Sequence, residues 1–309
     1  MSDYEDDFEI GESESEVEHE RPESWKPVTI DEVIIEGCIG GGALGIVRKG
    51  LYNGRAVALK TLFNCRVDET LMREYMDELN VLSKLNHPNI VKLLGACATP
   101  PNLFFVMELC HQSLYTRLHE CKGALDTKNI MSMALDVARG MSYLHAHRPP
   151  IIHRDLKSPN VLLATEDGPL KLCDFGLVRT RETTAGTPSY MAPELLENRP
   201  FNKSVDVYAF GILLWEIFSR EVPFLGYEVS DIREAVLSGG RPKVPRGGCP
   251  AEIKQLICKS WSQEPEDRPD FGDIMAVFET VLKDLPRSTH SELVDCNFGG
   301  DCLDDLLRK

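Results

Sequence analysis

The 309-residue sequence predicts an α+β fold of two lobes: a small lobe of five strands with one helix, and a larger, mainly helical lobe. Two observations support this prediction. Short β-rich runs fill residues 33–107, and helical periodicity follows Cys110. The chain also exceeds the usual size of a single domain, so its length makes two packed lobes as likely as one large core.

Five runs in the small lobe are rich in β-branched and aromatic residues and are bounded by turn signals. They span residues 33–40, 45–52, 55–62, 90–97 and 103–109. Asn53-Gly54 joins the second run to the third and is typical of a two-residue hairpin turn. A helix is predicted over residues 68–85, because apolar residues recur along one stripe of it. The stripe holds Leu71, Tyr75, Leu82 and Leu85.

The larger lobe has the period of amphipathic helices. Apolar residues recur at intervals of 4, 3, 4 and 3, at Ile130, Ala134, Val137, Met141 and Leu144. Four more helices are predicted near residues 205–218, 229–238, 250–261 and 270–284. The first of these is apolar on nearly every side, which indicates a helix buried in the protein core.

Charge is concentrated at the N-terminus. Residues 1–24 carry eleven acidic residues against one arginine, which is -10 of the total of -15. Such a segment cannot bury enough apolar surface to offset its ordering entropy, so residues 1–27 are predicted to be a disordered acidic tail. Two interpretations remain open: a regulatory arm that binds a partner protein, or a merely solubilising tail. The negative charge disfavours nucleic acid as a partner.

Ten cysteines without CxxC pairs or a signal segment indicate a reducing, cytoplasmic location. No apolar run approaches the length of a membrane span. Residues 286–309 lose periodicity and are expected to form a C-terminal tail.

Gly40, Gly42 and Gly45 have GxGxxG spacing, which dinucleotide-binding folds also use. A dinucleotide loop must open a helix, whereas Gly50 and the hairpin signal break any helix here. The glycines are therefore expected at a hairpin tip, where backbone amides approach phosphates. A purely structural tight turn is the alternative.

Strand alternation places Ala58 and Lys60 on one face of their strand. A buried ammonium requires a counter-charge, and Glu78 lies within the apolar stripe of the following helix. The two residues are therefore expected to pair. The alternative is that both side chains extend into solvent.

The stretch "HRDLKSPN" brings Asp155, Lys157 and Asn160 into one loop, and "LCDFGLVR" places Asp174 after a strand. In chain order the glycine motif, "VALK", Glu78, these two stretches and "APE" resemble the protein-kinase signature set. The resemblance covers about residues 28–285 and implies a bilobal protein-kinase fold. It also implies a small lobe over 28–107, a hinge over 108–114 and a large lobe over 115–285.

The resemblance implies an enzyme that uses ATP with Mg²⁺ to phosphorylate a protein substrate. Asp155 would accept the proton of the substrate hydroxyl, and Lys157 would neutralise the transferred phosphoryl group. Asn160 and Asp174 would hold Mg²⁺, while Lys60, paired with Glu78, would hold the phosphates. Other positions would line the nucleotide: Ile39, Gly40, Gly42, Gly45, Val47, Ala58, Met107, Glu108, Cys110 and Leu162.

Lys157 and "GTPSYMAPE" resemble serine/threonine kinases, whereas "DVYAFGILLWEI" resembles tyrosine kinases. The mixture is similar to the tyrosine-kinase-like group, which includes mixed-lineage and Raf-like kinases of signalling cascades. A pseudokinase scaffold and a tyrosine or dual-specificity kinase are the alternatives. The first is disfavoured because every catalytic position is occupied, and the second is disfavoured by Lys157 and Thr187.

The resemblance also implies an activation segment between the DFG and APE motifs. Phosphorylation of Thr180, Thr183 or Thr184 would create a charge that Arg154 could bind. The alternative is that Arg154 only packs locally. Glu194 and Arg268 are expected to form the buried ion pair that anchors the segment.

Overall fold

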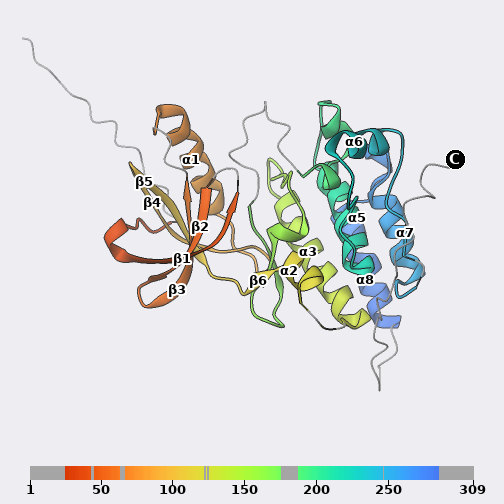
Figure 1. Cartoon of the computed structure of the whole chain (residues 1–309), viewed down its shortest axis with the longest axis horizontal. Coiled ribbons are helices and arrows are strands. Elements are labelled where there is room, and N and C mark those ends of the chain that lie inside the picture. The colour runs from red at the N-terminus through yellow and green to blue at the C-terminus, as the bar shows by residue number, and fades with distance from the viewer. Residues whose placement is uncertain are drawn as a thin grey trace, which may run out of the picture.

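The computed structural model describes residues 25–42, 45–62, 67–121, 123, 125–174, 187–245 and 247–284. It confirms the two-lobe α+β fold (Figure 1). The small lobe holds an antiparallel sheet in the order β1-β2-β3-β5-β4. Its elements are β1 (Val33–Gly42), β2 (Gly45–Tyr52), β3 (Arg55–Leu62), α1 (Glu69–Leu82), β4 (Leu93–Thr99) and β5 (Asn102–Glu108).

The hairpin between β2 and β3 sets which side chains share a face of the sheet. Asn53 and Gly54 both have positive φ, of 50° and 74°, as the predicted two-residue turn requires. The turn pairs Val47 with Lys60, and Ala58 pairs with Met107 on the next strand. Because side chains alternate along a strand, Val47, Ala58 and Lys60 lie on one face.

Helix α1 is fixed to the sheet by both polar and apolar contacts. Asp68 caps its N-terminus by accepting a hydrogen bond from the Leu71 amide at 2.8 Å. The hydroxyl of buried Tyr75 donates to the Cys97 and Phe104 carbonyls, at 2.9 and 3.0 Å. The helix therefore presents its buried face, which includes Glu78, to the sheet.

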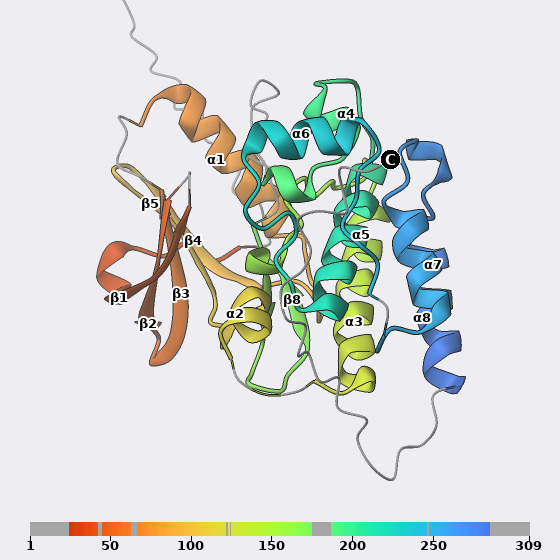
Figure 2. The same ribbon diagram turned by 45° about the vertical axis from the view of Figure 1, so that its right-hand side comes forward.

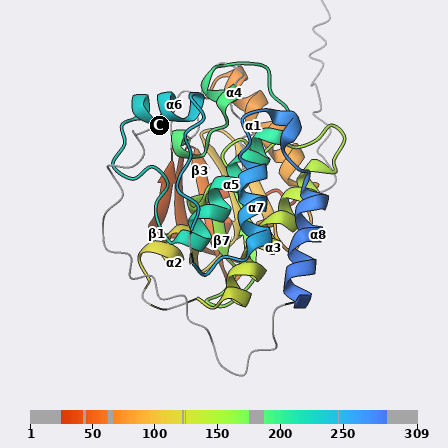
Figure 3. The ribbon, with the colours of Figure 1, turned by 90° about the vertical axis from the view of Figure 1, so that its right-hand side faces the viewer.

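The larger lobe is built around one buried helix, α5 (Ser204–Ser219), whose residues from 205 to 218 are all buried. Figures 2 and 3 show α5 among the other long helices of this lobe, and it packs against α3 and α7. The other helices are α2 (Leu114–His119), α3 (Thr127–His145), α4 (Pro193–Leu196), α6 (Val229–Leu237), α7 (Ala251–Ser260) and α8 (Phe271–Asp284).

Two features of the larger lobe go beyond the sequence analysis, which predicted only the strand before Asp174. One is the pair of short helices α2 and α4, which have too few residues for a period to be read. The other is a small antiparallel sheet of β6 (Gln112–Ser113), β7 (Val161–Leu163) and β8 (Leu170–Leu172). This sheet flanks the loop of the "HRDLKSPN" stretch and connects it to the end of the small lobe.

The N-terminal boundary differs from the expectation of a tail over residues 1–27. Pro27 forms a parallel bridge with Ala96 on β4, and the Ala96 amide donates to the Lys26 carbonyl at 3.0 Å. Residues 25–27 thus cover the edge of the sheet. The rest of that tail and the predicted tail over 286–309 lie outside the described residues. Among the described helices, none is long and apolar enough to cross a membrane.

Candidate active site

The glycine motif lies where β1 meets β2, and Gly42 pairs with Gly45 at the end of this hairpin. A Cβ on Gly45 would stand 2.2 Å from the Thr61 carbonyl oxygen, so close packing on β3 requires glycine there. A Cβ on Gly40 would meet only the Val47 side chain, at 4.0 Å. The two glycines therefore differ: Gly45 is needed for the sheet itself, whereas Gly40 leaves open space.

Lys60 lies between two carboxylates. Its Nζ is 3.4 Å from Glu78 Oε1 and 2.9 Å from Asp174 Oδ1, so the expected Lys60–Glu78 pair forms. Burial disfavours the ammonium, but Asp174 and Glu78 outweigh burial and raise the pKa of Lys60. Lys60 therefore carries a fixed positive charge that joins α1 to the Asp174 stretch.

The two carboxylates differ in their surroundings. Burial raises the pKa of Glu78, and Lys60 opposes this shift. Burial acts in the same direction on Asp174, but there the charge of Lys60 prevails and lowers its pKa. Asp174 is thus held as a carboxylate, the form that binds a divalent cation.

The catalytic-loop candidates contact one another directly. Lys157 Nζ lies 3.1 Å from Asp155 Oδ2 and donates to Thr187 Oγ1 at 2.7 Å. Asn160 Nδ2 donates to the backbone carbonyl and to Oδ2 of Asp155, at 2.9 and 3.0 Å. The structure therefore joins an acid, a cation, an amide and a hydroxyl in one constellation.

Asp206 on α5 positions the backbone just before Asp155. Its carboxylate accepts hydrogen bonds from the His153 and Arg154 amides, at 2.8 and 2.9 Å, and lies 2.8 Å from His145 Nε2. Arg154 has a positive φ of 65°, which a non-glycine residue adopts only when its surroundings hold it. The buried helix thus fixes the conformation of the loop that contains Asp155.

The two expected metal ligands lie close together. The Cys173 amide donates to the Asn160 carbonyl at 3.0 Å, which places Asp174 next to Asn160. Because the Asn160 amide nitrogen is directed at Asp155, its Oδ1 is the atom left to bind a cation. Within the described ranges no group of three or more His, Cys, Asp or Glu side chains is arranged so that it could hold a metal ion. This pair of oxygen ligands fits Mg²⁺, which usually takes only one or two protein carboxylates together with phosphates.

The expected nucleotide-lining residues come from both lobes. Met107 pairs with Ala58, and the following residue, Glu108, donates its amide to the Lys92 carbonyl at 3.0 Å. The Glu108 carboxylate binds Lys171 at 2.8 Å, so this stretch is tied to β8. Ala58, Cys110 and Leu162 are partly buried and pack against the same core. Ile39 is 52% exposed and lies on β1, two strands away from β3.

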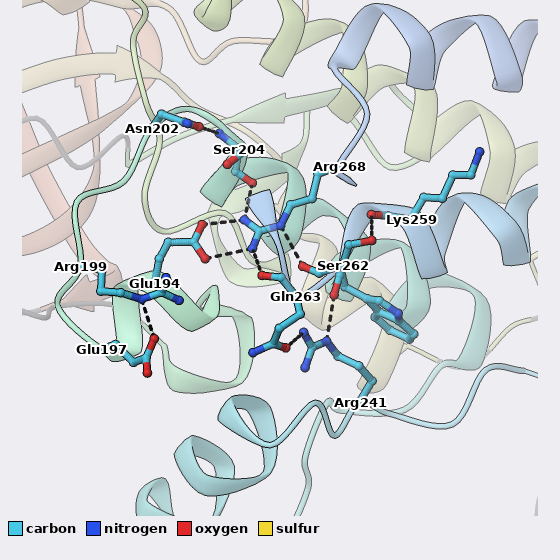
Figure 4. A network of polar contacts seen from close by, with 11 residues as sticks. Glu194, Glu197, Arg199, Asn202, Ser204, Arg241, Lys259, Ser262, Gln263 and Arg268 are labelled. Carbon is cyan, nitrogen blue, oxygen red and sulfur yellow. Dashed lines mark hydrogen bonds and ion pairs between the residues drawn. The ribbon is translucent and has the colours of Figure 1, made fainter. Parts of the chain in front are cut away.

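Glu194 and Arg268 form the expected buried ion pair, shown in Figure 4. Two guanidinium nitrogens donate to the two carboxylate oxygens, at 2.6 and 2.9 Å. Arg268 also donates to the carbonyls of Ser204, Ser262 and Gln263. The pair therefore joins α4 to the start of α5 and to the loop after α7. The threonines of the expected activation segment lie outside the described residues.

The sequence analysis gave no role to Asp206 or Glu216, the two acidic residues of α5. Both side chains are almost completely buried. Glu216 contacts His119, Ser158 and Tyr190, which come from three other parts of the lobe. One sequence signal could have found both residues. Each is a carboxylate in a helix that is otherwise apolar on every side, and a buried charge needs polar partners.

A family model described as "Protein tyrosine and serine/threonine kinase" matches residues 33–278. Serine/threonine-protein kinase CTR1 from Arabidopsis thaliana is 39% identical over 271 residues, which are 84% of this chain and 33% of the relative. The probable serine/threonine-protein kinase drkC from Dictyostelium discoideum is 40% identical, over 83% of this chain and 36% of the relative.

A third relative has a broader description. The dual specificity protein kinase shkC from Dictyostelium discoideum is 39% identical over 270 residues, which are 84% of this chain and 53% of the relative. The chain thus spans between a third and about half of the length of these three relatives.

Proposed function

Because the chain belongs to the family of protein tyrosine and serine/threonine kinases, we propose that it transfers the γ-phosphate of ATP to serine and threonine hydroxyls of proteins. The observation that carries this proposal is the contact chain from Asp155 through Lys157 to Thr187. It links a general base, a cation and a polar residue of the "GTPSYMAPE" stretch.

In the proposed reaction Asp155 orients the acceptor hydroxyl and takes its proton, while Lys157 stabilises negative charge on the transferred phosphoryl group. Lys60 holds the α- and β-phosphates, and Glu78 keeps Lys60 in place. Asn160 and Asp174 would hold Mg²⁺, which when bound neutralises charge on the phosphates.

The nucleotide itself would bind between the lobes. The adenine ring would lie against Val47, Ala58 and Leu162, with Met107 beside it. Backbone groups of Glu108 and Cys110 would hydrogen-bond to the ring. The carbonyl of Glu108 suits this role, because its amide already donates to Lys92.

The acceptor class rests on Thr187, whose hydroxyl binds Lys157. This contact lies beside the proposed catalytic loop, and the family resemblance implies that Lys157 and Thr187 flank the incoming hydroxyl. The dual-specificity description of shkC supports a second candidate, transfer to tyrosine as well. Phosphorylation of a degenerate peptide library distinguishes the two, because it reports the acceptor residue directly.

The activity is tested by Mg²⁺-dependent transfer from labelled ATP with wild type and Asp155→Asn. We expect the variant to lose at least about 10²-fold in turnover, the contribution of a positioned base, while ATP binding persists. Wild-type turnover in Asp155→Asn would refute the assigned base. A wild-type chain that binds ATP without transfer would favour a pseudokinase scaffold.

The proposal also includes the role of the kinase in the cell and its regulation. A tyrosine-kinase-like kinase in a signalling cascade, switched by phosphorylation of its activation segment, agrees with the mixed motifs of the sequence. Residues 28–285 would form the kinase domain, and the acidic N-terminal segment would recruit a regulatory partner.

A further inference from the structure

Glu216 is a completely buried carboxylate that contacts three separate parts of the larger lobe. Its Oε1 accepts a hydrogen bond from Ser158 Oγ at 2.6 Å and lies 2.9 Å from His119 Nε2. Its Oε2 accepts from the Tyr190 hydroxyl at 2.6 Å. Desolvation of a carboxylate costs several kcal/mol, so its retention in an apolar helix needs such partners.

The partners of Glu216 belong to the two stretches that the proposed catalysis must hold together. Ser158 follows Lys157 in the chain, and the Tyr190 amide donates to the Thr187 carbonyl at 2.9 Å. Lys157 in turn donates to Thr187 Oγ1 at 2.7 Å. Residues 157, 158, 216, 190 and 187 thus form a closed ring of covalent connections and hydrogen bonds, called the Glu216 ring below.

The side chains of the Glu216 ring have the protonation states that its hydrogen bonds require. Burial and the neighbouring Glu216 raise the pKa of Tyr190 far above its ordinary value, so its hydroxyl keeps its proton and donates. Ser158 is completely buried, and its Oγ lies 3.4 Å from the Tyr190 oxygen. His119 can donate from Nε2 as the corresponding neutral tautomer or as the charged form.

We propose that Glu216 is a positioning residue for the phosphoacceptor: by binding Ser158 and Tyr190 together it fixes Thr187 against Lys157. This inference rests on the proposed transfer to serine and threonine. Because Glu216 lies on α5, the same rigid helix holds the loop at two points: Asp206 before Asp155, and Glu216 after Lys157. Removal of one ring bond leaves the ring open, so removal of a second should add little.

The test uses the full chain with Tyr190→Phe, which removes one hydroxyl, with Ser158→Ala, and with both changes. Tyr208→Phe is the matched control, because it removes a buried tyrosine hydroxyl from α5 outside the ring. We expect Tyr190→Phe to lower kcat/KM for an acceptor peptide by about tenfold to 10²-fold, as a small misplacement of reacting groups does. The affinity for ATP should stay within about twofold of the wild-type value. The double variant should have the same kcat/KM as the less active of the two single variants.

Hydrogen–deuterium exchange gives a readout that does not depend on activity. Tyr190→Phe should speed exchange of the amides of residues 187–192 by about tenfold, while β5 amides keep their wild-type rates. Tyr208→Phe should leave both regions unchanged.

Unchanged exchange over 187–192 in Tyr190→Phe overturns the inference. Two other results also overturn it. One is that the losses of kcat/KM multiply when Tyr190→Phe and Ser158→Ala are combined, and the other is a loss of ATP affinity as large as the loss of kcat/KM. If wild type transfers no phosphate, the proposed function fails, while the exchange measurement still decides whether the ring holds this segment.

Discussion

Lys60 shows how much of the site depends on single charges. It is the cation that joins Glu78 of α1 to Asp174, with Nζ within 3.4 Å of both carboxylates. Its raised pKa and the lowered pKa of Asp174 have one cause, the attraction between these groups. Lys60 therefore stabilises the charged form of Asp174, and Asp174 stabilises the charged form of Lys60.

Replacing this cation should abolish most of the activity. Lys60→Met removes the proposed phosphate ligand and leaves Glu78 buried without its partner, so we expect turnover to fall by at least about 10²-fold. Steady-state kinetics with Mg-ATP measure the change. Lys49→Met is the control, because Lys49 is exposed and forms an exposed ion pair with Glu36 at 3.6 Å, away from the proposed phosphate site. An unchanged rate in Lys60→Met would show that this lysine does not hold the phosphates.

The cysteines near the proposed nucleotide site should be poor nucleophiles. Burial raises the pKa of Cys110 to about 11 and raises the pKa of Cys173 as well. Since only the thiolate reacts, iodoacetamide at pH 8 should modify exposed Cys38 well before either of them. Between pH 8 and 10 the rate at Cys110 should rise about tenfold per pH unit, as mass spectrometry of its peptide would show. Equal labelling of Cys38 and Cys110 at pH 8 would contradict this assignment.

At the scale of elements, α5 does more than fill the core. Its apolar side chains pack in all directions, while Asp206 and Glu216 hold backbone and side chains of the proposed catalytic loop. Arg268 reaches the first turn of the same helix through the Ser204 carbonyl. Helix α5 therefore holds the Asp155 loop, α4 and the stretch before α4 in place relative to one another.

The Glu194–Arg268 pair gives a stability prediction for α4. Glu194→Gln leaves a buried guanidinium without its counter-charge, so the free energy of unfolding should fall by roughly 3–5 kcal/mol. Glu197→Gln is the control, because its pair with Arg199 is 2.6 Å long but exposed and should contribute at most about 1 kcal/mol. Urea unfolding measures both. Equal effects of the two variants would mean that burial does not govern the strength of these pairs.

At the scale of the whole molecule, the Lys60–Asp174 pair and the Lys171–Glu108 pair tie the lobes to each other around the proposed site. Arg154 faces a different segment: its guanidinium lies 5.4 Å from the Phe201 ring centre. Arg154 thus lies beside the chain that leads from α4 into α5, next to the proposed base.

Phosphorylation of the activation segment is predicted to act through Arg154. A phosphate on Thr183 or Thr184 would pair with its guanidinium and order the segment, so phosphatase treatment should lower activity. Thr183→Ala with Thr184→Ala should mimic that loss, and Arg154→Ala should make the enzyme insensitive to phosphatase. Equal activity of treated and untreated enzyme at saturating Mg-ATP would leave the Glu194–Arg268 pair as the anchor and rule out the switch.

The sequence by itself determined what local patterns can encode. Runs of β-branched and aromatic residues and the Asn53-Gly54 turn predicted the strands of the small lobe, and periodicity predicted the long helices to within a few residues. Strand alternation and the need of a buried ammonium for a counter-charge predicted the Lys60–Glu78 pair, and the motif resemblance predicted the Glu194–Arg268 pair.

Beyond these two pairs, only the tertiary structure decided which distant groups meet. Lys157 and Thr187 are separated by 30 residues, and Ser158 and Glu216 by 58. A sequence pattern shows that Glu216 is a carboxylate in a buried helix and therefore needs donors, but not which ones. The partners of Glu216 depend on how α2, α5, the Asp155 loop and the turn at Pro188–Tyr190 pack together. This packing results from many long-range contacts, which a local sequence pattern does not show.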